Sequence, residues 1–269
     1  RSTHCISSAA SDVYKRQALL RTDLPKRAKE FAISRGLEWL LAMQSSNGGW
    51  GAFDRNNTRA LLREIPFADF GEMIDPPSVD VTAHIVELLG RLGYKKGFRP
   101  VDRALAYLKR EQEPDGAWYG RWGVNLTYGI GYVLPALAAV GEDMRAPYVR
   151  RAIDWLIKHQ NEDGGWGERV EGYYDPKWRG RGPSTASQTA WALLGLLAAG
   201  EADHRATKAG IEYLIRTQRE DGGWDQPYFT GTGFPTDFMI NYHLYRDNFP
   251  MMALGRYREA RRGDGETRG

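Results

Sequence analysis

Apolar residues recur at helical spacing in four segments of the chain, and each segment ends in the same short motif. In the first segment, Arg35–Trp50, the residues Leu37, Leu40 and Leu41 fall at positions i, i+3 and i+4, which is the spacing of one helix face. A glycine-rich stretch then interrupts the pattern. The same arrangement returns in segments 103–118, 151–166 and 209–224. The chain therefore reads as a helical repeat protein.

Each copy places a Gln near the predicted end of its helix, a Gly four residues after the Gln and a Trp six residues after it. Glycine adopts backbone angles that stop a helix. We expect the Gln amide to bond backbone groups left free at the helix end, and the Trp to fold back over that end. The residues predicted to form these structural turns are Gln44, Trp50, Gln112, Trp118, Gln160, Trp166, Gln218 and Trp224.

Between the copies lie segments richer in apolar and small residues, at 78–92, 125–140 and 187–199. The alternation predicts polar outer helices around an apolar inner ring. Helix pairs that close on themselves form an α/α toroid with a central cavity. The predicted fold is therefore all-α, an incomplete α/α toroid of the double-ring type with four Gln–Trp repeats, and no strand-rich segment is expected.

Composition and motif spacing argue against several classes of function. The chain has 42% hydrophobic and 26% charged residues, a formal net charge of +3 and one cysteine, so it resembles an ordinary globular protein without an internal disulfide. No apolar run approaches the length of a spanning helix. No His, Cys or acidic residues show metal-ligand spacing, and no glycine-rich phosphate loop appears outside the repeats. We expect no metal, no cofactor and no nucleic-acid partner.

The first 17 residues, 1–17, are Ser-rich, lack periodicity and match nothing later in the chain. We interpret them as a non-native read-through segment. The predicted domain is then 18–262, an α/α barrel truncated on its N-terminal side, followed by a disordered tail at 263–269.

Asp80 and His84 stand four residues apart in the inner segment 78–92, which places them on one helix face. Two interpretations remain open. His84 is either a core histidine with its hydrogen bonds satisfied, or a cavity histidine that positions or reprotonates an acid.

Aromatic residues cluster after the fourth repeat. Phe234, Phe238, Tyr242 and Tyr245 recur at about one helical turn and are predicted to form one aromatic helix face. Others lie in loops or at the start of an inner helix: Phe53, Phe67, Phe70, Trp122 and Tyr128. Each aromatic face can stabilise a cation by roughly 0.5–2 kcal/mol, as a carbocation reaction requires. Ordinary core packing is the alternative.

The sequence resembles the squalene–hopene cyclases, relatives of the sterol cyclases. The four repeats match that family's Gln–Trp motif, and GGWGAFD, DFGEMIDPPSVDVTAH, DGAWYGRWGVNLTYG, STASQTAWALL and GTGFPTDF also match. The resemblance spans about residues 18–261. It implies that an acid protonates squalene and that ring closure runs through carbocations in a dry aromatic cavity, ending in hopene or hopanol.

The resemblance also assigns roles to residues. His84 matches the histidine that hydrogen-bonds the acid, and Asp80 matches a supporting carboxylate. The implied substrate-binding residues are Phe53, Phe67, Phe70, Trp122, Tyr128, Phe234, Phe238, Ile240, Tyr242 and Tyr245. Phe53 stands where some relatives carry Tyr.

One family motif is missing. Asp-x-Asp-Asp, which carries the acid, does not occur in this sequence and would fall near residues 7–10. We therefore expect the fragment to be inactive alone and to aggregate. The resemblance implies squalene as substrate, a membrane surface contacted through the missing domain, a homodimer, and a peripheral, monotopic location on the cytoplasmic side of the cell membrane.

Two rival functions remain. A glycan-processing toroid requires two cavity carboxylates, for which Asp54 and Asp80 are the candidates. A non-catalytic repeat scaffold requires Phe234 and Phe238 to pack as core.

Overall fold

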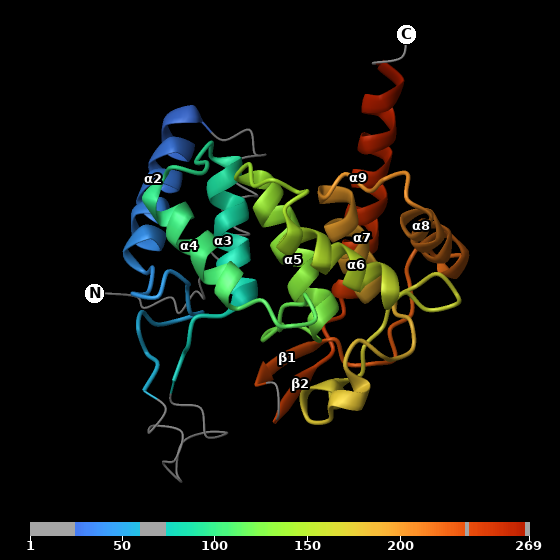
Figure 1. Ribbon diagram of the computed structural model, residues 1–269. Helices are drawn as coiled ribbons and strands as arrows, with labels where there is room; N and C mark the ends of the chain where they lie inside the picture. The colour runs from blue at the N-terminus through green and yellow to red at the C-terminus, as the bar shows by residue number, and fades with distance from the viewer. Residues whose placement is uncertain (1–24, 60–73, 235–236, 267–269) are drawn as a thin grey trace. The chain divides into compact units, whose positions relative to one another are not determined.

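The structure is a computed structural model that describes residues 25–59, 74–234 and 237–266 (Figure 1). The chain forms two compact units. The first comprises Arg1–Glu111 with Ala139–Glu142, and the second comprises Gln112–Ala138 with Asp143–Gly269.

The first unit contains α2 (Lys26–Ala42), α3 (Val79–Arg91) and α4 (Arg99–Arg110). Helix α3 is buried along nearly all of its length, whereas α4 buries one face and exposes charged residues on the other. The two helices pack against each other. The apolar pattern predicted buried inner helices and polar outer helices. In this unit, α3 has the inner character and α4 has the outer character.

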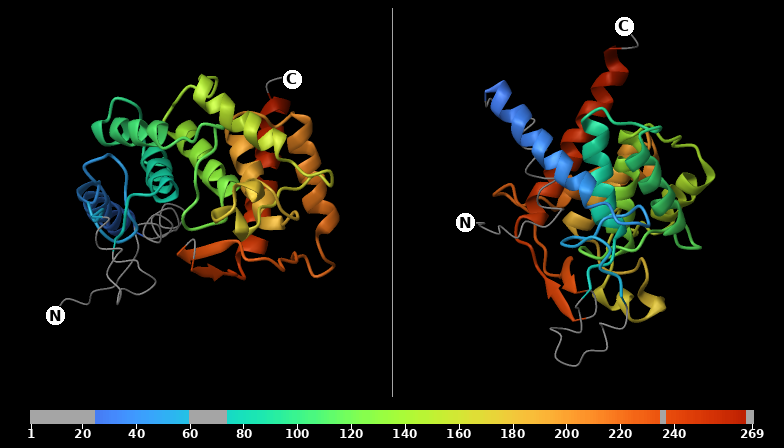
Figure 2. Two further views of the ribbon diagram at one scale, coloured as in Figure 1. Left: turned by 60° about the horizontal axis from the view of Figure 1, so that its bottom comes forward. Right: turned by 90° about the vertical axis from the view of Figure 1, so that its left-hand side faces the viewer.

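Within the described residues, the second unit holds α5 (Leu126–Ala139, except its last residue), α6 (Pro147–Lys158), α7 (Ala186–Ala198), α8 (Arg205–Thr217) and α9 (Tyr245–Glu266). Two short 3-10 helices, η3 (Val170–Tyr173) and η4 (Pro176–Trp178), precede α7. Helix α7 contacts α6, α8 and α9, and Figures 1 and 2 show it beside α9. Because other helices flank α7, ten of its side chains have almost no exposed surface. The polar side chain of Gln188 is one of them.

The four glycine turns share one backbone geometry. In each, the residue after the Gln donates its N–H to the carbonyl five residues after the Gln, at 2.9 Å. The Gly four residues after the Gln has a φ between +85° and +98°, the left-handed region that favours glycine. The preceding Asn or Asp side chain accepts a hydrogen bond from the backbone at 2.9–3.1 Å. The sequence motif thus specifies one defined turn.

In three of the copies, the hydrogen bond of the Trp indole closes the turn. The indole N–H donates to a carbonyl ten residues earlier, in the last turn of the preceding helix: Trp50 to Leu40 and Trp166 to Leu156 at 2.7 Å, and Trp224 to Leu214 at 2.8 Å. These three Trp side chains are 0–1% exposed. The expectation that the Trp folds back over the helix end is confirmed, and the bond satisfies a carbonyl that a helix terminus leaves free.

The Gln acts differently from the expectation. Its amide donates to the Gly carbonyl of its own turn and, in the first three copies, also to the next outer helix. The Gln therefore joins consecutive repeats instead of capping its own helix.

The prediction of a helical aromatic face around Phe234 and Phe238 is wrong. These residues lie on an antiparallel hairpin of β1 (Gly231–Phe234) and β2 (Phe238–Ile240), where they pair directly. Two glycines in β1 disfavour a helix there. The other edge of β1 bonds the loop before α5: Val124 N–H donates to Thr230 O at 2.9 Å, and Thr232 N–H donates to Trp122 O at 3.2 Å. Those bonds satisfy backbone groups that an isolated hairpin would expose.

No helix in the described parts of the chain is long and apolar enough to cross a membrane. Helix α9 continues to Glu266, four residues into the range 263–269 that the sequence assigned to a disordered tail.

The indole bond gives a first prediction. Trp166→Phe removes a buried donor and leaves the Leu156 carbonyl without it, so we expect a loss of about 2 kcal/mol in the free energy of unfolding. Urea denaturation measures the change. Trp39→Phe is the matched control, because Trp39 is 37% exposed, and it should change stability by less than about 0.5 kcal/mol. Equal losses in the two variants would contradict the role assigned to the indole bond.

Candidate functional site

Asp80 lies in the first turn of α3 in the first unit, and its side chain is fully buried. One carboxyl oxygen, Oδ1, accepts hydrogen bonds from the Ser78 hydroxyl at 2.5 Å and from the Val81 N–H at 2.9 Å. A helix N-terminus favours a negative charge, which offsets part of the cost of burying a carboxylate. The local fold therefore holds Asp80 in one orientation.

His84 follows one turn later on the same helix and is 3% exposed. Desolvation by burial lowers the pKa of His84 to about 4, while the negative charges of Asp80 and Glu87 act in the opposite direction. The imidazole is consequently neutral at neutral pH, with one ring nitrogen that donates and one that accepts. A neutral, buried imidazole one turn from a fixed carboxylate is suited to hydrogen-bonding an acid.

Phe53 lies in the loop after the first Trp turn, and its side chain is 48% exposed. The buried Asp75 carboxylate holds this loop. It accepts three successive backbone N–H groups, those of Ala52, Phe53 and Asp54, at 3.1, 2.5 and 2.6 Å. Sequence reasoning missed Asp75. The anchor fixes the main chain at Phe53 through its backbone N–H.

In the second unit, aromatic side chains from three helices form one cluster. Tyr128 on α5 lies edge-on to Trp191 on α7, with ring centroids 4.8 Å apart. Trp191 in turn contacts Tyr245 at 5.8 Å and Phe249 at 5.5 Å, both on α9. Tyr132 lies 4.7 Å from Tyr128. These separations fall in the range of favourable aromatic pairs.

The cluster includes predicted and unpredicted residues. Tyr128, Tyr242 and Tyr245 were singled out from the sequence, and Tyr242 stacks at a tilt on Tyr245 at 4.6 Å. Trp191, Tyr132 and Phe249 were missed; they lie on predicted inner helices or beyond the assigned motifs, where an aromatic looks like ordinary core.

Other predicted aromatics lie on the hairpin or next to it. Trp122 and Phe234 are half-buried, Phe238 is 47% exposed and Tyr242 is 39% exposed. Ile240 on β2 is half-buried. Since Phe238 is so exposed, it does not pack as core, which is what a purely structural scaffold requires. Phe67 and Phe70 lie outside the described residues.

A buried polar network fixes the start of α5, which carries Tyr128. Glu168 is 4% exposed and accepts backbone N–H groups of Asn125 at 3.3 Å, Thr127 at 2.6 Å and Gly180 at 3.0 Å. Gln188 on α7 donates to the carbonyls of Val124 and Glu168, both at 3.1 Å. An acidic side chain at free helix N–H groups acts as a cap from another segment.

The rival pair of carboxylates does not share an environment. Asp54 is exposed and bonds the Asn57 amide at 2.9 Å, whereas Asp80 is fully buried. In the described ranges, no group of three or more His, Cys, Asp or Glu side chains could hold a metal ion.

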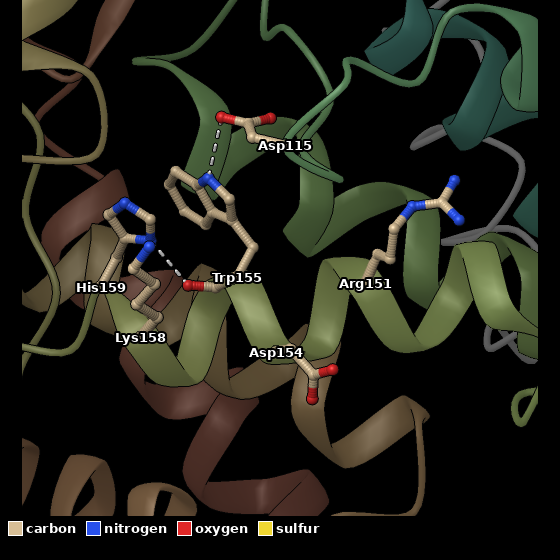
Figure 3. A pocket seen from close by; sticks show the side chains of 6 residues that line it. All are labelled: Asp115, Arg151, Asp154, Trp155, Lys158 and His159. Carbon is tan, nitrogen blue, oxygen red and sulfur yellow. Dashed lines mark hydrogen bonds between the residues drawn. The ribbon is translucent and has the colours of Figure 1, made fainter.

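Figure 3 shows a pocket of about 330 Å³ on the outer helix α6. The Trp155 indole donates to Asp115 at 3.2 Å, and His159 stacks on the Trp155 ring at 3.8 Å. Charged side chains dominate its lining, which consists of Asp115, Arg151, Asp154, Trp155, Lys158 and His159. Such a surface does not suit an apolar ligand.

Comparison with known proteins gives consistent matches. The family model described as squalene-hopene cyclase C-terminal domain matches residues 13–259, so the match begins inside the segment 1–17. The squalene–hopene cyclase of Alicyclobacillus acidocaldarius is 56% identical over 87% of this chain and 37% of its own length. The chain thus spans about a third of the length of the curated relatives it matches.

Solved structures show the fold. A type II terpene cyclase from Scytonema, in complex with geranylgeranyl dihydroxybenzoate, has a TM-score of 0.66 at 18% identity, over 94% of this chain and 74% of its own. An unsaturated glucuronyl hydrolase specific for heparin has a TM-score of 0.61 at 16% identity, over 96% and 76%. The α/α toroid prediction is confirmed, and fold alone does not separate the two chemistries.

The buried histidine gives a prediction of pH dependence. Because the His84 pKa is lowered to about 4, the unfolded chain binds the proton more tightly than the folded chain. Stability is then full above about pH 6.5 and falls as the pH drops toward 4, by about 2 kcal/mol between pH 7.5 and pH 5. Urea denaturation of the wild type and of His84→Gln checks this. If the two proteins lose the same stability over that range, or if the His84 resonance titrates near pH 6.5, the prediction is wrong.

Proposed function

Because the chain belongs to the squalene–hopene cyclase family, we propose that it forms part of an enzyme that closes squalene into hopene or hopanol through carbocations. The observation that carries the proposal, beside the family match, is the aromatic cluster of Tyr128, Trp191, Tyr245 and Phe249. Aromatic faces stabilise a cation without offering it a strong nucleophile. A hydrolytic function on glycans would instead need paired carboxylates.

Asp80 and His84 support the acid that starts the reaction. In this proposal, the acid itself belongs to Asp-x-Asp-Asp, a motif absent from the sequence. Neutral His84 offers a hydrogen bond that holds the acid proton in place, and it later relays a proton back to the carboxylate. Asp80 is held by the Ser78 hydroxyl and the Val81 N–H. It orients the start of α3 and makes it polar, one helical turn before His84. Water exclusion around these groups strengthens each electrostatic contact.

The aromatic residues bind the substrate and its cations. Glu168 holds the backbone beside Tyr128 through the Thr127 N–H, and the Tyr128 ring packs on Gly123, whose added Cβ would lie 2.5 Å from the ring. Trp122, Phe234, Phe238, Ile240 and Tyr242 are also proposed as substrate-binding residues, and so, on the family resemblance alone, are Phe53, Phe67 and Phe70. A rigid ring position matters because the energy of a cation over a ring depends on their separation.

Family resemblance also supports association with a membrane surface on its cytoplasmic side, and a homodimer. The membrane contact is assigned to the domain that this chain does not contain. A vesicle flotation assay and sedimentation analysis of the longer polypeptide test these two assignments.

The activity test uses squalene. We expect this chain alone to give no hopene or hopanol by gas chromatography, and the polypeptide extended to its relatives' length to give product. In the extended protein, His84→Ala should lower the rate of product formation by about 10²-fold, the usual scale for a group that serves proton transfer. His159→Gln, on the outer helix α6, is the matched histidine control and should leave the rate unchanged.

Hopene formation by the short chain would contradict the assignment of the starting acid to the missing motif. Full activity of His84→Ala in the extended protein would remove His84 from the mechanism.

Exposed apolar residues around α9 give a prediction of self-association. Leu244, Met251 and Met252 are 67%, 58% and 42% exposed, and Phe238 lies on the adjoining hairpin. Exposed apolar side chains promote aggregation when they come together on a surface. Light scattering should show association of the chain alone that grows with salt concentration, and Leu244→Glu with Met251→Glu should reduce it severalfold. Unchanged scattering in the double variant would contradict the prediction.

A further inference from the structure

Trp191 on α7 touches aromatic rings of two other helices in the second unit. The Tyr128 ring of α5 lies 4.8 Å from it at an interplanar angle of 74°. The Tyr245 and Phe249 rings of α9 lie 5.8 and 5.5 Å from it, at 83° and 71°. The energy of such edge-to-face pairs depends on the separation and the angle of the rings. Trp191 therefore links a ring of α5 to two rings of α9.

Trp191 has no surface from which it could touch a bound molecule. Its side chain is 0% exposed, whereas Tyr245 is half-buried and Tyr242, which stacks on Tyr245, is 39% exposed. Any influence of Trp191 on a ligand therefore passes through the rings that it contacts.

The backbones of α5 and α7 approach each other closely beside Trp191. A Cβ added at Gly131 of α5 would lie 2.6 Å from the Trp191 carbonyl oxygen and 2.9 Å from the Trp191 Cβ. A Cβ added at Gly195, one turn after Trp191, would lie 3.5 Å from the Gly131 Cα. A glycine inside a helix lowers its stability, but at Gly131 the close approach leaves no room for a larger residue. This crossing fixes the backbone of Trp191 relative to Tyr128, three residues before Gly131.

The indole N–H of Trp191 differs from those of the repeat turns. Its nitrogen is buried, and no atom of the described residues accepts a hydrogen bond from it. The Trp166 N–H, in contrast, donates to the Leu156 carbonyl at 2.7 Å. A buried donor without an acceptor costs free energy, so hydrogen bonding does not account for a tryptophan at position 191. The size of the ring, which reaches three other rings, does.

We propose that Trp191, held in place by the contact of Gly131 with α7, is a positioning residue that keeps Tyr128 and Tyr245 at a fixed separation. Its role in the reaction rests on the proposed function. The two tyrosine rings then stabilise cations, and their separation determines how many rings close before the cation loses its proton. Early proton loss gives isomers of hopene with fewer rings. A displaced ring causes it because the attraction between a cation and a ring weakens with distance.

The first experiment measures the coupling between the two tyrosines and does not involve the reaction. In this chain at low protein concentration, Tyr128→Leu and Tyr245→Leu together should lower Tm by about 2–4 °C less than the sum of the single losses. The first change loosens Trp191, so the second has less left to remove. In the Trp191→Leu background, the two losses should add to within about 1 °C. Additive losses with Trp191 present, or equal coupling in both backgrounds, overturn the proposal.

The second experiment assays the polypeptide extended to its relatives' length with squalene, by gas chromatography. Trp191→Phe should raise the share of isomers with fewer rings about threefold or more over the wild type, because a smaller ring no longer holds both tyrosines. Gly131→Ala should give the same shift, since its Cβ would force α5 away from α7. Gly195→Ala, whose nearest contact would be 3.2 Å, should give a smaller one.

Two matched variants separate positioning from stability. Trp166→Phe loses a hydrogen bond, so it should lower Tm about twice as much as Trp191→Phe or more, yet keep the wild-type product distribution. Gly255→Ala lies on α9, where no atom is within 4 Å of an added Cβ. It should not lower Tm, and it should leave the product distribution unchanged.

An unchanged product distribution in Trp191→Phe, or an equal shift in Trp166→Phe, overturns the proposal. An extended wild-type protein that forms no product from squalene contradicts the proposed function instead. The Tm coupling of Tyr128 and Tyr245 then decides by itself whether Trp191 positions the two rings.

Discussion

The hydrogen bond from the Trp indole to the carbonyl ten residues before it, present at Trp50, Trp166 and Trp224, is the constraint on which the arrangement of these repeats depends. The bond closes the chain back on the outer helix and so determines where the following segment begins. Since the next helix then starts at a set place, the Gln of the same turn can reach its second residue. The indole N–H bonds a carbonyl that the helix end leaves free, and the indole ring shields that carbonyl from water. The same Trp is therefore both a helix cap and part of the core.

Local patterns predicted much of the fold. The inner segment 78–92 differs by one residue at each end from α3, Val79–Arg91, because apolar periodicity and flanking glycines act over a few residues. The hairpin was missed because Phe234 and Phe238 are spaced as in a helix, while the pairing of β1 with the loop at Val124 depends on residues far away in sequence. The candidate site shows the same difference between what local sequence predicts and what depends on distant residues. Tyr128 and His84 could be selected from the sequence, but Glu168 and Asp75 act on backbone groups that only the folded chain brings to them.

Glu87 and Glu142 are buried acidic side chains that pair with cationic side chains, whereas backbone N–H groups compensate most of the charge of the others. Glu168 meets the free amides at the start of α5, and Asp80 bonds the first turn of α3 and the Ser78 hydroxyl. Backbone donors are fixed by the fold and need no cationic side chain, which would attract water into the interior or compete for a carboxylate. His84, kept neutral by burial, adds no positive charge at neutral pH. The proposed reaction therefore has polar groups at defined positions within an otherwise apolar interior.

Because Asp75 binds main-chain groups, the path of the loop does not depend on which side chain stands at position 53. All three hydrogen bonds from the loop at Phe53 come from main-chain N–H groups, so any residue except proline could stand at position 53 and keep them. Mutation there can therefore change the size or polarity of the half-exposed side chain at little cost in folding. The hydrogen bonds that position this loop therefore do not depend on the chemistry of the side chain that the loop carries.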